Sequence, residues 1–230
     1  MSTAASPRGC WPALYCSMGP TLLSLNVGQL EPLTAGSPKR TGIRKHSVGG
    51  AILCDTLGLV GDAIGSPKHH GGPDQAVYLY SAEDYAWWRE HEGVDTSPGH
   101  FGENLTIDAW WPDARVGDHV TFGDVTLELT APRIPCATLA ARIGDPHFVK
   151  RFAQAGRPGA YARVITTGAL EAPTTGVLTR GDSRWPTIVE LMSAWYRLPR
   201  DRAELLAYTK APLAVRAREA FVTWAAGASE

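Results

Sequence analysis

The sequence predicts a mixed, β-rich protein that carries a small helical module at its C-terminal end. Alternating apolar and polar residues flank the turn Gly123-Asp124 and predict a β-hairpin over 119–129, the clearest of roughly seven or more short strands. From Pro186 onward the apolar period becomes helical, with residues at i, i+3, i+4 and i+7 starting at Ile188. These patterns favour a β-rich body followed by short helices.

The remaining elements are predicted by local patterns in chain order. Short apolar runs bounded by glycine or polar residues predict strands over 22–27, 51–59, 77–80 and 161–166. Ser81 followed by Asp84 resembles a capping arrangement and predicts a helix that reaches Glu92. Helical patterns also cover 137–143, 146–155, 205–206 and 213–224. The last two join the helix that starts at Ile188 in a compact three-helix module.

We divide the chain into a leader over 1–21, a body over 22–182 and a C-terminal helical module over 183–230. The leader is predicted to be disordered, because the first credible strand starts at Leu22. Translation from Met18 is the alternative, which the intact mass of the natively expressed protein would decide. Nothing in the helical module has the chemistry of a catalytic site, so we interpret it as a structural or docking unit.

Composition excludes several classes of function. A net charge of -1 and 20% charged residues give no overall attraction to nucleic acid or to anionic membranes. The four cysteines show no C-x-x-C pair and no zinc or iron-sulfur spacing, and no signal peptide or membrane span is recognisable, which predicts a cytoplasmic protein. P-loop and dinucleotide fingerprints are absent, so no NAD or flavin site is apparent, and no spaced carboxylate pair indicates a glycosidase. The oligomeric state stays open.

The sequence around Cys136 singles out this thiol as a candidate reactive group. Pro132 and Pro135 fix the backbone and bias the preceding residues toward extended conformation, so the segment is expected to be stiff. The charge of Arg133 favours the thiolate, the form that attacks electrophiles and binds soft metals. The alternative is that Cys136 is a small buried apolar residue, as most free cysteines are.

Two loops concentrate polar groups that suit an anionic ligand. Residues 36–46 contain four cations within seven positions together with the hydroxyl of Thr41. Such a run is commonly only solvated surface, but it also has the chemistry that wraps a phosphate. Residues 68–74 contain two adjacent histidines, which point to opposite faces of an extended backbone, so one is expected to pack and the other to face a pocket. Gly71-Gly72 permits a ligand to approach the backbone closely.

Four motifs in this order resemble the MOSC-domain family, and within it the YiiM-like branch. They are Thr41-Gly42-Ile43-Arg44-Lys45, His70-Gly71-Gly72-Pro73-Asp74, Phe101-Gly102-Glu103-Asn104-Leu105 and Pro132-Arg133-Ile134-Pro135-Cys136. The match extends from about Leu22 to the last helix and therefore covers nearly the whole chain. The resemblance implies a MOSC-type β-barrel with peripheral helices and a C-terminal three-helix module.

The resemblance also implies a site for the molybdenum cofactor, molybdopterin. Cys136 is then the candidate molybdenum ligand and catalytic thiol, and His70 a possible proton donor. The polar wall around the cofactor and its phosphate is implied to comprise Thr41, Lys45, Lys68, His70, Asn104 and Arg133. The implied activity is the reduction of small N-hydroxylated bases, such as 6-hydroxylaminopurine. Because no nicotinamide fingerprint or iron-sulfur spacing is present, we expect a separate electron-donor protein.

Two other functions fit the same residues. One is a carrier that binds molybdopterin and passes it on without turnover, for which the cationic loops would serve equally well. The other is a cofactor-free thiol enzyme or sulfur-transfer protein that uses Cys136 as its nucleophile. Metal and pterin analysis separates the last from the first two, and turnover separates the reductase from the carrier.

Overall fold

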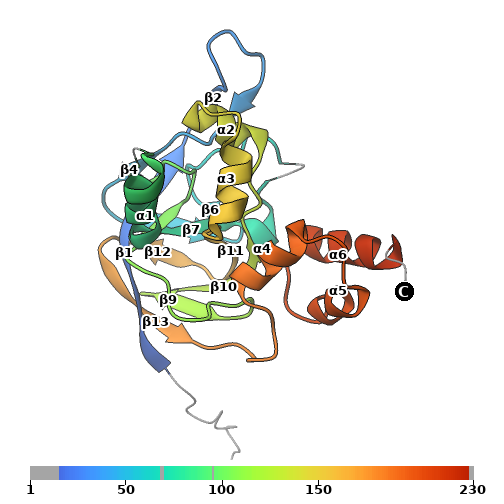
Figure 1. Ribbon diagram of the computed structural model, residues 1–230. Coiled ribbons are helices and arrows are strands. Elements are labelled where there is room, and N and C mark those ends of the chain that lie inside the picture. The colour runs from blue at the N-terminus through green and yellow to red at the C-terminus, as the bar shows by residue number, and fades with distance from the viewer. Residues whose placement is uncertain (1–15, 68–69, 95, 228–230) are drawn as a thin grey trace, which may run out of the picture.

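The computed structural model describes residues 16–67, 70–94 and 96–227. Within them, seven strands close into a barrel in the order β13, β9, β10, β11, β7, β8 and β1, with β1 returning to β13 (Figure 1). These strands are β1 (Cys16–Gly28), β7 (Val77–Ser81), β8 (Leu105–Ile107), β9 (His119–Phe122), β10 (Val125–Pro132), β11 (Ala160–Thr166) and β13 (Thr174–Thr179). Neighbours are antiparallel except for the parallel pair β7 and β8. The predicted β-barrel with peripheral helices is confirmed.

Shorter strands extend the barrel sheet at β1 or form two small separate sheets. Strand β4 (Lys45–Val48) pairs with the end of β1. A separate small sheet contains β5 (Ile52–Asp55), β6 (Gly58–Leu59) and β12 (Gly168–Leu170). Strands β2 (Glu31–Pro32) and β3 (Arg40–Thr41) pair at the base of a hairpin that protrudes beside α2 (Ala137–Ile143) in Figure 1.

The first strand begins earlier than predicted. The apolar pattern placed its start at Leu22 and left 1–21 as a leader, but β1 already begins at Cys16. Cys16, Ser17 and Met18 pair with residues 177–179 of β13, which lie far along the chain. Backbone pairing with a distant strand needs no local apolar alternation, so the sequence pattern did not reveal it. Residues 1–15, the rest of the predicted leader, lie outside the described residues.

Helices cover one side of the barrel and extend from it. Helix α1 (Ala82–Glu92) begins where predicted, because the Ser81 hydroxyl accepts a hydrogen bond from the backbone N–H of Asp84 at 3.0 Å. The other elements are the short 3-10 helix η1 (Pro73–Gln75), α3 (Phe148–Ala155), α4 (Ile188–Tyr196), α5 (Arg202–Tyr208) and α6 (Val215–Gly227). The last three are the predicted C-terminal helices, and α5 and α6 project sideways from the barrel (Figure 1). Among the described helices, none is long and apolar enough to span a membrane.

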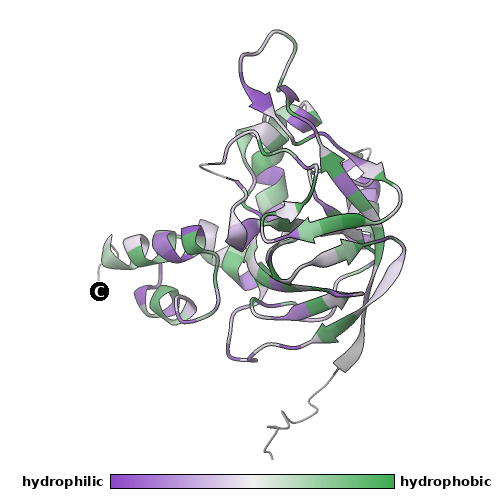
Figure 2. Ribbon diagram, turned by 180° about the vertical axis from the view of Figure 1, so that it is seen from behind, coloured by the Kyte–Doolittle hydropathy of each residue, from purple (hydrophilic) through white to green (hydrophobic). Residues whose placement is uncertain are grey.

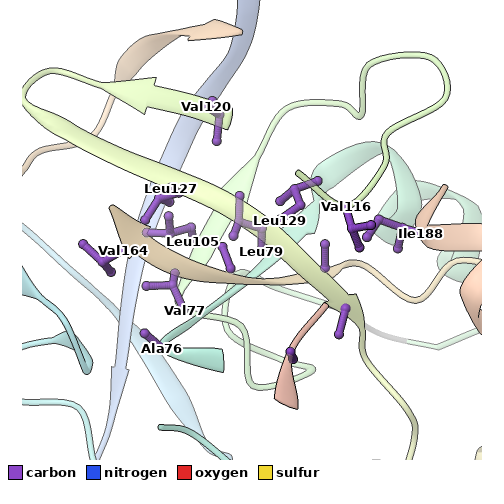
Figure 3. Packing of buried hydrophobic residues seen from close by; sticks show 14 of the residues in the cluster. Ala76, Val77, Leu79, Leu105, Val116, Val120, Leu127, Leu129, Val164 and Ile188 are labelled. Carbon is purple, nitrogen blue, oxygen red and sulfur yellow. The ribbon is translucent and has the colours of Figure 1, made fainter. Parts of the chain in front are cut away.

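The barrel strands divide their side chains between two hydrophobic cores. Strand β7 shows the division: Val77 and Leu79 belong to the core inside the barrel, whereas Tyr78 and Tyr80 belong to a second core beneath the helices. This explains why every residue of β7 is buried. Figure 2 shows hydrophobic and hydrophilic residues interspersed along the strands, and Figure 3 shows the interior side chains meeting near Leu105 and Leu129. Ile188 of α4 joins the same cluster beside Val116.

The second core is an aromatic cluster that supports the loop of Phe101. Trp88 of α1 lies at its centre, stacked on Phe152 with 5.8 Å between ring centroids and edge-on to Phe101 at the same separation. Its indole N–H donates to the Tyr80 hydroxyl at 2.7 Å. The backbone carbonyl of Phe101 in turn accepts a hydrogen bond from Arg133, so this core bears directly on the Cys136 segment.

We predict that Trp88→Ala lowers the free energy of unfolding by about 3–5 kcal/mol, because it opens a cavity in a fully buried aromatic cluster. Urea denaturation followed by circular dichroism measures the loss. Its neighbour Trp87 is only partly buried and provides the control, for which Trp87→Ala should cost about 1 kcal/mol. Equal losses for the two variants would contradict the assigned packing.

Candidate functional site

Cys136 lies in the connection between the last residue of barrel strand β10 and the first residue of helix α2. Strand β10 ends at Pro132, and Cys136 is the N-cap residue of α2 with an extended backbone, φ -135° and ψ 169°. Pro135 favours extended backbone in the residue before it, as the sequence predicted for a stiff segment. The side chain is partly buried rather than enclosed in hydrocarbon, and it lines a cavity. Its position therefore agrees with a reactive thiol more than with a packing residue.

The environment of Cys136 favours the thiolate. Burial by itself raises the pKa of a thiol, but here the hydrogen bond with His70 and the charge of Arg133 outweigh it, and the pKa of Cys136 falls to about 6. Cys54 gives the contrast within the same chain, because burial raises its pKa to about 12. At neutral pH Cys54 and Cys136 are therefore in opposite states, with Cys54 protonated and Cys136 largely ionised.

Arg133 is held rigidly beneath this thiol. Only 5% of its surface is exposed, its guanidinium donates to the carbonyl of Phe101, and it lies over the Tyr78 ring with 5.1 Å to the centroid. Burial opposes the charge, but the nearby Tyr78, Tyr161 and Cys136 outweigh it, so the pKa of Arg133 stays above its ordinary value. The guanidinium is thus a fixed positive charge at the floor of the site.

The structure brings the predicted site residues together around one cavity. Segments far apart in the sequence contribute its wall, and the predicted residues that line it are Thr41, Lys45, His70, Asn104, Arg133 and Cys136. Lys68 lies outside the described residues. The sequence prediction did not include several other lining residues, among them Lys39, Asp62, Gln75, Tyr78, Thr138 and Tyr161.

Several predicted phosphate binders already have partners within the protein. Lys45 is 7% exposed and forms an ion pair with Asp62. The Asp62 carboxylate also accepts hydrogen bonds from the side-chain amide of Asn104 at 2.9 Å and from the N–H of Gly28 at 2.8 Å. Thr41 accepts from the N–H of Ile43 at 3.1 Å. Lys45 and Asn104 therefore fix the cavity wall, with the charge of Lys45 largely balanced by Asp62.

The remaining cations of the 36–46 loop differ in their partners and in whether they line the cavity. Arg44 pairs with Glu31 at 3.0 Å and so holds the protruding hairpin. Lys39 and Arg40 line the cavity, and neither has a carboxylate partner among the residues that the structure covers. Lys39 donates to the Thr138 hydroxyl at 3.2 Å, which links the hairpin to α2. Positive charge is therefore available at Lys39 and Arg40 more than at Lys45.

The histidine loop depends on glycine. Gly71 and Gly72 have φ values of 69° and 84°, which side-chain-bearing residues rarely adopt, and a Cβ on Gly71 would meet Ile64 at 2.2 Å. A Cβ on Gly42 would meet the carbonyl oxygen of Ala63 at 1.8 Å. These close approaches to residues 63–64 explain glycine in both motifs.

The C-terminal helices anchor the same loop. Arg216 of α6 donates hydrogen bonds to the carbonyls of Pro67 and Gly71 at 2.9 Å and to the Gln75 side chain at 2.5 Å. Asp74 accepts from the N–H of Val215 at 2.9 Å and pairs with Arg163 at 3.0 Å. The helical module thus holds the loop that carries His70, which is a structural role of the kind that the sequence indicated as one of two alternatives.

Comparison with known proteins assigns the barrel and its cavity to a known family. The model of the MOSC domain matches residues 66–182, slightly more than half of the chain. The chain belongs to the MOSC-domain family. The matched part includes the histidine loop, the Asn104 loop and the Cys136 segment of the MOSC barrel.

Three similar proteins show where this chain lies within the MOSC-domain family. Protein YiiM of Escherichia coli is 30% identical over 151 residues, which are 64% of this chain and 66% of YiiM. A protein named reductase from Gibberella moniliformis is 31% identical over 173 residues, which are 73% of this chain but only 31% of that protein. The crystal structure of YiiM from Geobacillus stearothermophilus has a TM-score of 0.75 and 25% identity, covering 90% of this chain and 99% of that one. The predicted YiiM-like MOSC resemblance is confirmed.

Three residues that shape the site, Asp62, Arg163 and Arg216, were not predicted from the sequence. The first two had weak signals in the sequence. Asp62 lies between the glycines Gly61 and Gly65, which mark a loop, although nothing local shows that it faces Lys45. Arg163 is a charged residue within the predicted strand 161–166, where a charge is uncommon, and the structure gives it two carboxylate partners, Asp74 and Glu128. Arg216 had no such signal, because it lies on an amphipathic helix where exposed cations are common.

We predict that alkylation of Cys136 by iodoacetamide follows a titration midpoint near pH 6, measured by mass spectrometry of the peptide that contains it. Reactivity should fall below this pH because the thiolate is protonated. His70→Ala removes the hydrogen bond that favours the thiolate, so the midpoint should rise toward that of an ordinary cysteine, about 8.5. Cys54→Ala is the control and should leave the midpoint unchanged; a wild-type midpoint above 8 would refute the assigned environment.

A second prediction concerns the positioning of His70. Arg216→Ala should raise the alkylation midpoint of Cys136 and speed amide hydrogen exchange over residues 70–75, because the loop loses three hydrogen bonds. Arg218→Ala is matched: it removes hydrogen bonds to the carbonyls of Thr209 and Ala211 within the module and should change neither quantity. Identical profiles for the two variants would argue against the anchoring role.

Proposed function

We propose that this MOSC protein binds a molybdopterin-type molybdenum cofactor in the Cys136 cavity and reduces small N-hydroxylated bases or related compounds. MOSC domains are associated with molybdenum cofactor binding as a family. The observation that carries the proposal for this chain is the ionised thiol itself. Cys136 combines a lowered pKa with exposure to a cavity whose wall contains cations and other residues from six separate segments of the chain.

The donor chemistry of the cavity fits this cofactor. A thiolate is a soft ligand and suits a sulfur-binding metal better than a carboxylate does. Cys136 would therefore be the protein's ligand to molybdenum, with Arg133 keeping the sulfur anionic. His70, hydrogen-bonded to the same sulfur, would fix its orientation.

The phosphate of the cofactor fits the charge at the cavity's edge. Lys45 is balanced by Asp62, whereas Lys39 and Arg40 line the cavity without a carboxylate partner among the described residues. We assign the phosphate contacts mainly to Lys39 and Arg40 through charge-assisted hydrogen bonds. Thr41, Lys45 and Asn104, the residues implied by the family resemblance, act by shaping the wall behind them.

The proposed reaction converts an N-hydroxyl compound to the amine and water and consumes two electrons and two protons. When bound, the cofactor supplies the two-electron chemistry at its metal. The chain supplies the rest: the hydrogen bond with His70 and the charge of Arg133 favour the thiolate, and the imidazole of His70 would deliver a proton to the leaving oxygen.

The electrons are proposed to come from a separate protein. The name of the fungal relative is reductase, and this chain matches only 31% of that protein's length. The sequence of this chain contains no nicotinamide fingerprint and no iron-sulfur cysteine spacing. An assay therefore has to provide a reduced dye or a donor protein rather than NADH alone.

Expression in a host that makes the cofactor tests this proposal. The purified protein is expected to contain molybdenum and pterin and to reduce 6-hydroxylaminopurine with a reduced dye as donor. Cys136→Ser should lose turnover and most of the metal, because a neutral hydroxyl replaces the thiolate ligand. Metal content is measured by mass spectrometry and pterin by the fluorescence of its oxidised form.

Cys54→Ala is the matched control, since it removes a buried thiol that does not line the cavity, and it should keep metal and turnover. Full metal and full turnover in Cys136→Ser would overturn the assignment of the ligand. Bound cofactor without any turnover would instead identify a carrier. Preparations that contain neither molybdenum nor pterin would leave the cofactor-free thiol function.

A further inference from the structure

Glu103 is a fully buried carboxylate that has no part in the cavity described above. It belongs to the same motif as Gly102 and Asn104, which do line that cavity. A buried carboxylate is costly unless hydrogen bonds or an ion pair compensate it. No ion pair to Glu103 is found within residues 16–67, 70–94 and 96–227, so its hydrogen bonds have to explain its position.

Three hydrogen-bond donors surround the Glu103 carboxylate. One of its oxygens accepts from the backbone N–H of Gly99 at 2.5 Å and from the Thr106 hydroxyl at 2.9 Å. The other oxygen accepts from the Tyr85 hydroxyl at 2.6 Å. Burial raises the pKa of Glu103, whereas these hydrogen bonds oppose that rise because they favour the carboxylate. All three donors are themselves buried, so the carboxylate joins its loop to β8 and α1 in the protein interior.

Tyr85 extends this network to Phe101. The Tyr85 hydroxyl donates to Glu103 and accepts a hydrogen bond from the backbone N–H of Phe101 at 2.9 Å. The carbonyl of Phe101 accepts from Arg133. A hydroxyl that donates to a carboxylate becomes a better acceptor, so the two hydrogen bonds of Tyr85 strengthen each other. Glu103 is therefore connected through Tyr85 and Phe101 to the guanidinium that acts on the thiol.

The backbone of the loop needs such support. Gly99 and Gly102 have φ values of 82° and 83°, and the N–H of Gly102 donates to the carbonyl of Gly99 at 3.0 Å to close a tight turn. A Cβ on Gly99 would meet the carbonyl oxygen of Lys45 at 2.6 Å, so the turn packs directly on the backbone of the neighbouring strand β4. The Glu103 carboxylate binds the first residue of this turn and thereby fixes the direction of the Phe101 carbonyl within it.

We propose that Glu103 is a positioning residue for the Cys136 site. Its carboxylate holds the loop over 99–103 in the conformation that directs the Phe101 carbonyl at the guanidinium of Arg133, and Arg133 in turn acts on the thiol. Glu103 itself does not line the cavity, so it acts through these residues rather than on a ligand. The role applies equally whether Cys136 binds molybdenum or acts as a free thiol.

The substitution Glu103→Gln tests this role, because glutamine keeps the size of the side chain but can accept at only one of its two polar atoms. The alkylation midpoint of Cys136 should rise by roughly half a pH unit or more, because Arg133 is held less firmly beside the thiol. Loss of a negative charge without any movement of the loop would instead lower the midpoint, since it favours the thiolate. Amide hydrogen exchange over residues 99–104 should become faster in the same variant.

Tyr85→Phe removes the connecting hydroxyl and keeps the test available if Glu103→Gln does not fold. It should also raise the midpoint, and the double variant should shift it by less than the sum of the two single shifts, because both substitutions break one network. The measurements use full-length protein produced in a host that does not make molybdopterin, so that the sulfur of Cys136 is free to react.

Asp118→Asn is the matched control, because Asp118 is also a fully buried carboxylate but lies away from the Cys136 cavity. It accepts hydrogen bonds from the indole N–H of Trp111 at 2.7 Å, the backbone N–H of Arg115 at 3.1 Å and that of Gly181 at 2.7 Å. Asp118→Asn should therefore lower the stability toward urea, as Glu103→Gln does, but leave the alkylation midpoint unchanged.

A Cys136 midpoint that is unchanged or lower in either Glu103→Gln or Tyr85→Phe would overturn the proposal. An equal rise in Asp118→Asn would do the same, because the shift would then reflect general destabilisation. Since the readout needs no cofactor, the presence or absence of molybdenum in the wild type decides the proposed function separately.

Discussion

The site depends on a positive charge buried where no carboxylate balances it. Arg133 is 5% exposed, and no ion pair with Asp or Glu is found for it among the described residues. An uncompensated buried charge is costly, and the guanidinium does not lose its proton. The Phe101 carbonyl and the Tyr78 ring compensate only in part, and the thiolate of Cys136 adds a negative charge that favours the guanidinium. Ionising the thiol therefore stabilises the protein that surrounds it.

This constraint links the site to the two hydrophobic cores. Tyr78 and Phe101 hold Arg133, and both belong to the aromatic core, while alternate residues of β7 belong to the core inside the barrel. On the other side of the thiol, the His70 loop is held by Arg216 of α6 and through Asp74 by Arg163 of β11. The thiol is thus bounded by groups fixed to different layers of the fold, an arrangement that preorganises it before any ligand binds.

Local patterns predicted the elements whose causes are local. The hairpin around Gly123-Asp124, the Ser81 cap and the C-terminal helices all follow from spacing within a few residues. Strands β4, β8 and β13 were not predicted, because they are short and their stability comes from partners far along the chain. The same distinction between local and long-range causes applies to the residues of the site. The cavity residues were recognised by their motifs, but the pairing of Lys45 with Asp62 depends on tertiary contact that no motif contains.

Positive charge in the Cys136 cavity is concentrated at its hairpin edge and beside the sulfur. Lys39 and Arg40 place unbalanced positive charge at the hairpin edge, and Arg133 places it beneath the sulfur. An anionic ligand of this cavity therefore meets positive charge at both places, whereas Lys45 is balanced by Asp62. The helical module bears on the same cavity through Arg216, which holds the loop of His70. A MOSC barrel without these helices would therefore lose the support of one of the groups that favour the thiolate.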